Sequence, residues 1–403
     1  MRPCFKEARV NPTFNIARLP RIEFGPGAFQ KVASLAAGFG QRALIVTGAH
    51  SFLASPHWAS LQTELSDKGV TWDLVQVAGE PSPELIDQAV RLYQGQRFDV
   101  VLGIGGGSAL DAAKAIAGLL KPGNSVRDHL EGVGPELPYR GPATPFIAVP
   151  TTAGTGSEAT KNAVLSVQGA EGFKKSFRDD KLVAEYAIVD PDLLATCPPG
   201  VLAANGMDAF TQLLESYVST KANPFTDALA LSGLEAARDG LLPWYEGTGD
   251  AADCRGRMAY AALLSGITLA QVGLGSVHGL ASPLGAFFPI PHGVVCGTLV
   301  AAATQVNIAA IRQREPDNRA LKKYADVGRL LRQEALADDA AITALLETLE
   351  DWTRRLELPR LSAYGIAQMD FGRVVANSRG SSMKTNPIVL TDSEIAQLLA
   401  ARL

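Results

Sequence analysis

The fold of this chain is decided by residues 98–108, which read Phe-Asp-Val-Val-Leu-Gly-Ile-Gly-Gly-Gly-Ser. A continuous apolar run is typical of a buried strand, and an Ala-rich segment that predicts a helix follows over residues 109–120. Glycines at such a turn let the backbone approach a pyrophosphate, and the start of a helix offers free amides and partial positive charge. The stretch therefore predicts a strand, a phosphate-binding turn and a helix. We expect Ser108 to cap this helix, with Asp111 three residues further on.

Strand-like and helix-like segments alternate through the first half of the chain. Strands are expected over residues 42–47, 71–77, 98–102 and 146–149, and helices over residues 58–68, 83–93 and 109–120. Such alternation predicts a parallel sheet covered by helices, with right-handed connections and ligands at the carboxyl ends of the strands.

A second loop with a ligand-binding composition follows the strand at 146–149. Residues 150–158 read Pro-Thr-Thr-Ala-Gly-Thr-Gly-Ser-Glu, and their small size and hydroxyl groups suit close approach of a ligand. The first loop is not the usual dinucleotide fingerprint, because Ser108 stands where the last glycine should be. The two loops together predict cofactor contacts from Gly105, Gly106, Gly107, Ser108, Asp111, Thr151, Thr152 and Thr155.

The pattern changes after about residue 195. Strand-like runs disappear, and Ala/Leu-rich helical stretches follow over residues 204–219, 224–238, 254–272, 294–311, 321–336 and 340–356. A turn cluster, Cys-Pro-Pro-Gly at 197–200, marks the boundary. A chain of 403 residues is too long for one ordinary core. We therefore expect an α/β domain over residues 1–195 and an all-helical domain over residues 196–403.

Composition narrows the class of protein. The chain is 47% hydrophobic and 19% charged with a formal charge of −4, which is typical of soluble globular proteins and gives no basic excess for nucleic acid. We expect no apolar run of the roughly 20 residues that span a bilayer. Cys4, Cys197, Cys254 and Cys296 are scattered, as in reduced thiols of a cytoplasmic protein. No nucleic-acid or membrane partner is expected.

Two of the five histidines, His278 and His292, lie in one Gly- and Pro-rich segment that we expect to expose its backbone rather than form a helix core. Upstream, Asp208 and Gln212 stand four apart in a helix-like run. Two imidazoles and a carboxylate suit a divalent metal such as zinc or ferrous iron, and Gln212 can add a carbonyl oxygen. The alternatives are that Asp208 only caps a helix and that Gln212 is an ordinary helix-face residue. Metal and nucleotide together indicate an enzyme.

Several of these segments resemble the iron-containing (group III) alcohol dehydrogenase family, in family order from about residue 14 to the C-terminus. The matching segments are residues 22–27, 105–114, 150–158, 187–191, 206–210 and 277–293. The resemblance implies a dehydroquinate synthase-like architecture, in which a Rossmann-like dinucleotide-binding domain joins a helical domain that binds metal and substrate. It implies an NAD(P)-dependent oxidoreductase that interconverts an alcohol and an aldehyde or ketone, assisted by iron or zinc, in a dimer or larger assembly.

The family's metal site uses one aspartate and three histidines. The resemblance places the aspartate at Asp208 and two histidines at His278 and His292, but the third position is Gln212. A further family histidine, often given a proton-relay role, falls on Ser282. We therefore expect His278, Ser282 and His292 as catalytic residues and a metal site of lowered affinity. Proton transfer would use the serine, the cofactor ribose or water.

The resemblance also bears on cofactor and substrate. Many family members that prefer NAD carry aspartate where this chain has Gly48, so we expect NADP to be accepted and mildly favoured over NAD. Arg379 and Lys384 stand among small hydroxyl residues near the C-terminus and indicate a substrate that carries an anionic group. The alternative is a solvated loop before a final helix over residues 392–403.

Two other functions remain open at this point. One is a lyase or cyclase like the dehydroquinate synthases, whose metal site begins with glutamate where this chain has Asp208. The other is a catalytically altered protein that only binds a nucleotide. Net turnover of the cofactor with a carbonyl substrate separates all three.

Overall fold

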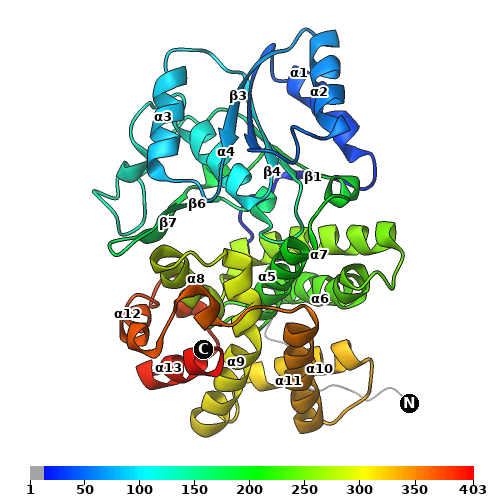
Figure 1. Ribbon diagram of the computed structural model, residues 1–403, viewed down its shortest axis with the longest axis vertical. Helices are drawn as coiled ribbons and strands as arrows, with labels where there is room; N and C mark the ends of the chain where they lie inside the picture. Colours follow the sequence, from blue (N-terminus) through cyan, green and yellow to red (C-terminus); the bar gives the residue numbers. More distant parts are fainter. Residues whose placement is uncertain (1–12) are drawn as a thin grey trace.

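A six-stranded parallel sheet stands on a helical unit in the computed structural model, which describes residues 13–403 (Figure 1). The strand order is β1-β8-β5-β4-β2-β3. The strands are β1 (Arg21–Phe24), β2 (Arg42–Gly48), β3 (Thr71–Val77), β4 (Val100–Gly105), β5 (Phe146–Pro150) and β8 (Tyr186–Val189). The expected parallel sheet is confirmed, and all four expected strands are present within three residues. Strands β1 and β8 were not predicted, because runs of four residues give too little alternation to recognise.

Helices cover both faces of this sheet. They are α1 (Val32–Ala37), α2 (Pro56–Asp67), α3 (Pro83–Tyr93) and α4 (Gly107–Leu119). Leu44 and Val46 of β2 pack into a core with α3 and α4, whereas Ala43 and Ile45 pack into a second core with α1 and α2. Successive side chains of a strand point to opposite faces, so a strand buried on both faces is apolar throughout. That is why β2 reads as a continuous hydrophobic run.

The connections of the central strands create a crevice for ligands. Strand β2 pairs with β3 on one side and with β4 on the other, so the chain reverses its direction across the sheet at β2. Open parallel sheets bind ligands outside the carboxyl ends of the strands at such a switch point. Gly48 ends β2 and Gly105 ends β4, and both therefore lie at the edge where a cofactor is expected.

A small antiparallel sheet, which the sequence analysis missed, lies beside this edge. It consists of β6 (Asn162–Val167) and β7 (Phe173–Arg178). Strand β7 carries Lys174, Lys175 and Arg178, and most of its residues are half-buried. Its charges hide the hydrophobic alternation by which a strand is recognised.

The second half of the chain is helical, as expected. Its helices are α5 (Pro199–Val218), α6 (Pro224–Tyr245), α7 (Ala251–Val272), α8 (Ser276–Phe287), α9 (His292–Arg314), α10 (Arg319–Arg332), α11 (Asp338–Arg355), α12 (Phe371–Ala376) and α13 (Asp392–Ala401). The expectation that the Gly- and Pro-rich histidine segment exposes its backbone is wrong, because it forms the buried helix α8. A Cβ atom on Gly279 would lie 2.9 Å from Met383 Cε, so glycine here permits close packing.

Helix α9 corrects a second expectation. Its 23 residues, with a mean hydropathy of 1.8 over the most apolar window, are long and apolar enough to cross a membrane, although no such run was expected. However, 89% of that window is buried within the protein, where α9 contacts α5, α8, α11 and α13. Burial against other helices accounts for its apolar composition without a bilayer.

The two units meet through glycines. A Cβ atom built on Gly156, in the loop after β5, would lie 2.4 Å from the backbone of Gly266 in α7. Gly156 also has a φ of 61°, in the left-handed region that favours glycine. This contact fixes the loop after β5 against the helical unit.

Candidate metal and cofactor site

The glycine-rich turn after β4 begins α4 differently from the expectation. Gly106, rather than Ser108, is the N-cap of α4, and it makes no side-chain cap hydrogen bond. The expectation that Ser108 caps the helix is therefore wrong. The chain turns at Gly106, whose backbone is extended, so Ser108 already lies inside the first helical turn. Amides of the first turn that have no capping side chain suit an anionic ligand such as phosphate.

The two predicted cofactor loops lie against each other. A Cβ atom on Gly107 would lie 2.6 Å from Thr155 Cγ2, and one on Gly106 would lie 3.3 Å from Thr152 Oγ1. Gly107 in particular leaves no space for a side chain at this contact. The glycine loop and the threonine loop therefore form one continuous rim.

Gly48 completes this rim on the other side of β4. The amide of Thr151 donates to the Gly105 carbonyl oxygen over 2.9 Å. A Cβ atom on Gly105 would lie 3.3 Å from the Gly48 amide nitrogen and 2.7 Å from Ala109 Cβ. The predicted cofactor residues from β2, β4 and β5 thus come together at the switch point of the sheet.

Asp111 and Lys114 of α4 bind the loop that follows β5. The sequence alone did not indicate these contacts. Lys114 is fully buried, and its Nζ donates to the carbonyl oxygens of Ser157 and Asn162 and to Thr160 Oγ1, over 2.6 to 2.9 Å. Asp111 accepts from Ser157 Oγ at 2.5 Å. Both side chains therefore hold the loop that follows β5 in place.

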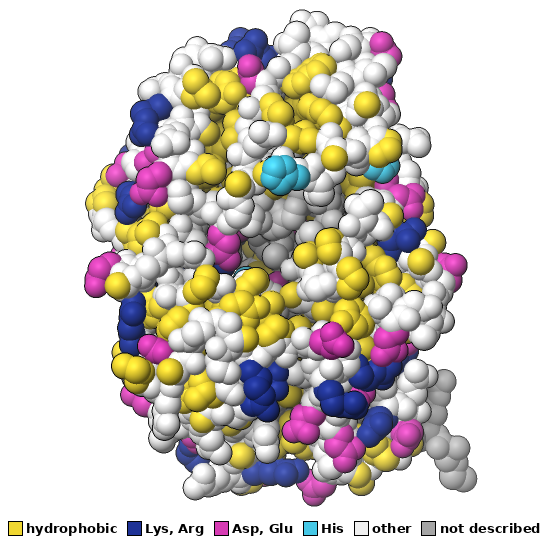
Figure 2. Space-filling view, viewed as in Figure 1, with side chains coloured by type: hydrophobic (Ala, Val, Ile, Leu, Met, Phe, Trp, Pro, Cys, Tyr) yellow, Lys and Arg dark blue, Asp and Glu magenta, His cyan; other side chains and the backbone are white. Residues whose placement is uncertain are grey.

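A cleft lies between the rim and the helical unit, and Figure 2 shows the hollow between the two halves. Its cavity volume is about 270 Å³. The predicted residues that line it are Gly107, Ser108, Asp111, Thr155, Gln212, His278, Ser282 and His292. Phosphate-loop residues and histidines therefore face the same space.

Four possible metal ligands meet at the helical wall of this cleft. They are Asp208 of α5, His278 of α8, and His292 and Cys296 of α9, and one ligand atom from each lies within 4.8 Å of all the others. His278 Nε2 lies 3.2 Å from Asp208 Oδ1, and His292 Nε2 lies 3.8 Å from the same oxygen. The alternative that Asp208 caps a helix is excluded, because Asp208 lies within α5 and is fully buried.

Two further observations indicate that these four side chains could bind a divalent cation. Asp208 Oδ2 and His292 Nδ1 are buried polar atoms without a hydrogen-bond partner among the described residues. A buried carboxylate oxygen that lacks a partner is costly unless a cation or donor compensates it. Carboxylate and imidazole are also ligands that suit zinc and iron.

Glu215 orients His278 from the next turns of α5. His278 Nδ1 lies 2.7 Å from Glu215 Oε2, and the Val277 amide donates to Glu215 Oε1 over 2.7 Å. A carboxylate only accepts, so the hydrogen is on Nδ1 and Nε2 faces Asp208. Metal-binding histidines commonly donate their other N–H to a carboxylate in this way.

The electrostatics of the cluster follow from burial and close charges. Burial disfavours charged His278, but Cys296, Asp208 and Glu215 outweigh it and hold its pKa well above the ordinary value. Burial lowers the pKa of His292 to about 4 and raises that of Cys296 to about 12. Burial opposes ionisation of Asp208, yet the two histidines keep its pKa below the ordinary value. Asp208 is therefore the permanent negative charge of the cluster.

Comparison with known proteins decides the family. The family described as iron-containing alcohol dehydrogenase matches residues 20–191, and the C-terminal part of the Fe-containing alcohol dehydrogenase family matches residues 202–403. The chain belongs to the iron-containing alcohol dehydrogenase family. It is therefore an enzyme, an oxidoreductase of the alcohol dehydrogenase class.

Relatives along the whole length agree with this family. The chain is 34% identical to 1-propanol dehydrogenase PduQ of Citrobacter freundii over 331 residues, which cover 80% of this chain and 83% of that one. It is 30% identical to an NAD-dependent methanol dehydrogenase of Bacillus methanolicus, over 94% of this chain and 97% of that one. A crystal structure of 1,3-propanediol oxidoreductase superposes with a TM-score of 0.87 at 25% identity, over 97% of this chain and 100% of that one.

This alcohol dehydrogenase departs from the family pattern at two positions. Gln212 Nε2 donates to Asp208 Oδ1 over 3.2 Å, and its carbonyl oxygen accepts from Ser265 Oγ at 2.7 Å. In this orientation Gln212 presents an amide N–H to the cluster rather than the expected oxygen ligand. Ser282 lines the cleft, but its Oγ donates to the Lys174 carbonyl oxygen over 2.8 Å.

Sequence reasoning missed two residues of the site. Cys296 lies four residues after His292, which places both on one face of α9, and this spacing could have identified it. Glu215 lies seven residues after Asp208, again on one face of a helix. Among the described residues the three cysteines are free, and Cys4 lies outside them.

The two cations expected to bind an anionic substrate do not reach the cleft. Arg379 donates to the Leu390 carbonyl oxygen at 2.7 Å and pairs with Asp392 at 2.5 Å, because the start of α13 lies beside it. Lys384 is exposed, and neither residue lines the cavity. The expectation of an anion site at Arg379 and Lys384 is therefore wrong.

Proposed function

We propose that this enzyme transfers hydride in the cleft between the two units, between a nicotinamide ring and the carbinol carbon of a small alcohol. One observation carries the proposal: Gly107 and Ser108 of the phosphate loop line the same cavity as His278 and His292. A cofactor whose pyrophosphate rests on the start of α4 would direct its nicotinamide towards these histidines. A cavity of about 270 Å³ is small for a ligand site and favours a short substrate.

We assign the metal to Asp208, His278 and His292. A divalent metal held there would polarise the substrate oxygen and stabilise its alkoxide character. His292 retains 27% exposure of its side chain, so it is the donor closest to the open cleft. Asp208 provides the charge, and Glu215 fixes the imidazole of His278 through Nδ1. The Ser282 hydroxyl donates its hydrogen to the Lys174 carbonyl oxygen, so its own oxygen is left to accept a proton, and water or the cofactor ribose are the other candidates for that step.

We assign the cofactor to Gly48, Gly105, Gly106, Gly107, Ser108, Asp111, Thr151, Thr152 and Thr155. Gly48 ends β2 without a carboxylate that would repel a 2′-phosphate, and a Cβ atom built on it meets nothing within 4 Å. This space supports acceptance of NADP, with a mild preference over NAD.

A polar or anionic group of the substrate would meet a cation that lines the cavity, rather than Arg379 or Lys384. Lys174 pairs with Glu80 at 2.5 Å and Arg178 pairs with Glu131 at 3.2 Å, so both cations are already compensated. Lys175 lines the same cavity, and no ion pair is found for it within residues 13–403. We propose that Lys175 meets the polar end of the substrate.

We further propose that residues 1–195 and 196–403 are separate domains of a cytoplasmic homodimer or larger oligomer that has no nucleic-acid or membrane partner. The formal charge of −4 supports the absence of a nucleic-acid partner, and the burial of α9 supports the absence of a membrane one. Limited proteolysis near residue 196 and light scattering test the domains and the assembly.

The proposal is tested by a screen of small alcohols, aldehydes and keto acids with NAD(H) and NADP(H), with and without added zinc, iron or manganese. We expect stoichiometric oxidation or reduction of the cofactor that depends on added metal. Product formation without net cofactor turnover would instead indicate a cyclase or lyase like the dehydroquinate synthases. Cofactor binding without any turnover would indicate a nucleotide-binding protein.

A further inference from the structure

The cluster of possible metal ligands contains one sulfur donor, Cys296. It lacks the histidine that the family has where this chain has Gln212. We propose that Cys296 is a ligand of the metal, in place of the histidine replaced by Gln212, and that the site consequently takes zinc in preference to ferrous iron. This inference rests on the proposed metal site and deepens it.

The distances among the four possible ligand atoms suit a bound metal ion. Cys296 Sγ lies 3.5 Å from His278 Nε2 and 3.8 Å from His292 Nε2. Asp208 Oδ1 lies 3.2 Å and 3.8 Å from the same two nitrogens. A tetrahedral zinc ion with bonds of about 2.0 to 2.3 Å has its ligand atoms roughly 3.3 to 3.6 Å apart. These four separations lie within about 0.2 Å of that range, and all four donor atoms lie within 4.8 Å of one another.

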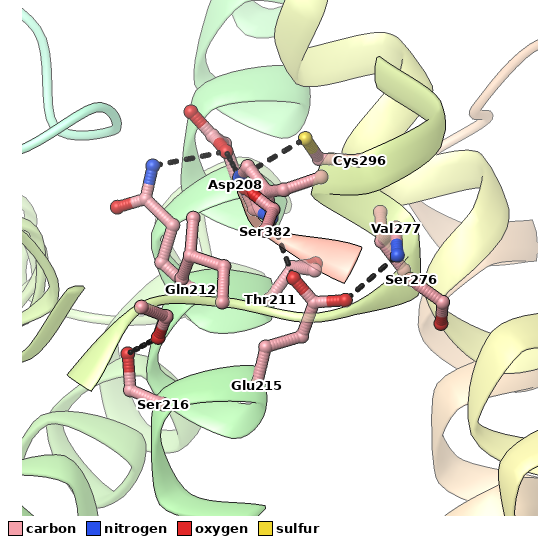
Figure 3. Close-up of polar contacts among 12 residues, drawn as sticks. Asp208, Thr211, Gln212, Glu215, Ser216, Ser276, Val277, Cys296 and Ser382 are labelled. Carbon is pink, nitrogen blue, oxygen red and sulfur yellow. Dashed lines mark hydrogen bonds and ion pairs between the residues drawn. The ribbon is translucent and has the colours of Figure 1, made fainter. Parts of the chain in front are cut away.

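The side chains on either side of Asp208 differ in what they contact. Figure 3 shows Asp208 between Gln212 and Cys296, with the side chains of both directed towards it. The Gln212 amide N–H donates to Asp208, and its carbonyl oxygen already accepts from Ser265. Cys296 is fully buried, and its sulfur faces the ring nitrogens of the two histidines and the carboxylate of Asp208. Cys296 therefore contacts the other possible ligands as a metal ligand would, whereas the Gln212 amide hydrogen-bonds Asp208 and Ser265.

The cluster contains a buried carboxylate oxygen that no donor among residues 13–403 compensates. Asp208 Oδ2 is buried, belongs to a fully buried residue, and has no partner in the described part of the chain. This orphaned oxygen is independent of the cysteine and points to a missing positive group. On metal binding the Sγ–H proton of Cys296 would leave to solvent and the sulfur would bind the ion as thiolate.

A thiolate changes which metal is preferred and how strongly it acts. Affinity for divalent ions rises from ferrous iron to zinc, and soft sulfur ligands increase that preference. Asp208 and a Cys296 thiolate together cancel the charge of a divalent ion, whereas one aspartate with three neutral histidines leaves one positive charge. The bound ion would therefore be a milder Lewis acid than in relatives that retain the histidine.

Cobalt(II) provides the direct test, because a thiolate bound to cobalt gives a near-ultraviolet charge-transfer band that imidazole and carboxylate do not give. We expect this band in the cobalt-loaded full-length enzyme and in the control Cys254→Ser, whose buried cysteine lies on α7 away from the cluster. Cys296→Ser should lose the band. It should also bind zinc more than about tenfold more weakly, because losing a ligand should exceed the 10–100-fold cost of losing a ligand's hydrogen-bond partner.

The possible failures are separable. Cobalt binding without the band, or the same band in Cys296→Ser, would overturn the ligand role of Cys296 and leave the proposed metal site standing. Absence of any cobalt or zinc binding would overturn both. If Cys296→Ser does not fold, X-ray absorption of the zinc enzyme decides, since the proposal requires one sulfur at about 2.3 Å. The double variant Cys296→Ser/Gln212→His should regain zinc affinity without regaining the band.

Discussion

Glu215→Gln probes the site through a residue that touches neither substrate nor cofactor. The carboxylate accepts two hydrogen bonds of 2.7 Å, one from His278 Nδ1 and one from the Val277 amide. Glutamine keeps an oxygen for Val277, but its NH₂ group would face His278 Nδ1. His278 Nδ1 can pair with this NH₂ group only as an acceptor. The single hydrogen of the neutral ring must then sit on Nε2, so Nε2 has no lone pair left to bind a metal.

The expected loss can be estimated from this exchange. One hydrogen bond to a charged group is worth about 1.5 to 3 kcal/mol, and partners of this kind typically contribute about 10–100-fold to metal affinity. We therefore expect the zinc dissociation constant of Glu215→Gln to rise about 10–100-fold, measured by competition with a chromogenic chelator. Ser216→Ala is the matched control, because its hydroxyl bonds the Gly273 carbonyl oxygen on another face of α5. An unchanged zinc dissociation constant in Glu215→Gln would refute the role of Glu215.

Three further variants test other parts of the structure. Burial raises the pKa of Glu158 from 4.5 to about 7. The folded protein therefore favours the protonated carboxyl, and the resulting stability is fully present below pH 4.5 and is lost as the pH rises through 7. Glu158→Gln should therefore gain up to about 3 kcal/mol in unfolding free energy relative to wild type between pH 5 and pH 8, and parallel denaturation profiles would contradict this. Gly48→Asp should raise KM for NADP while KM for NAD stays the same or falls; equal changes for both cofactors would separate Gly48 from the 2′-position. Lys175→Ala should raise KM for a carboxylated aldehyde, whereas the exposed Lys384→Ala should not, and the reverse order would restore the original anion site.

The sequence predicted the elements whose signal is local. The continuous apolar run of β2 and the strand, turn and helix around residues 98–119 follow from hydrophobicity and glycine alone. The histidine-rich segment misled, because Gly279 and Pro283 usually interrupt helices. In α8 their cost is offset by close packing in the core.

The three main residues of the candidate metal site could be predicted from the sequence, whereas the orientation of Gln212 and the contacts of Cys296 and Glu215 could not. Asp208, His278 and His292 were expected from their residue types and from the resemblance, and the structure brings them together from three helices. Cys296 was not predicted because its four-residue spacing from His292 becomes informative only once residues 292–296 are known to form one helix. The burial of Lys114 could not be predicted, because nothing nearby in sequence reveals the carbonyl oxygens that compensate it.

In the proposed function, a metal held by Asp208, His278 and His292 supports hydride transfer from a nicotinamide cofactor in the cleft. The most direct measurement removes the metal with a chelator and follows oxidation of NADPH by a short aldehyde before and after zinc or ferrous iron is restored. We expect the wild-type enzyme to lose and regain activity, and His292→Ala to remain inactive at metal concentrations that restore the wild type. Full activity of the verified metal-free enzyme, or equal recovery by His292→Ala, would contradict the account.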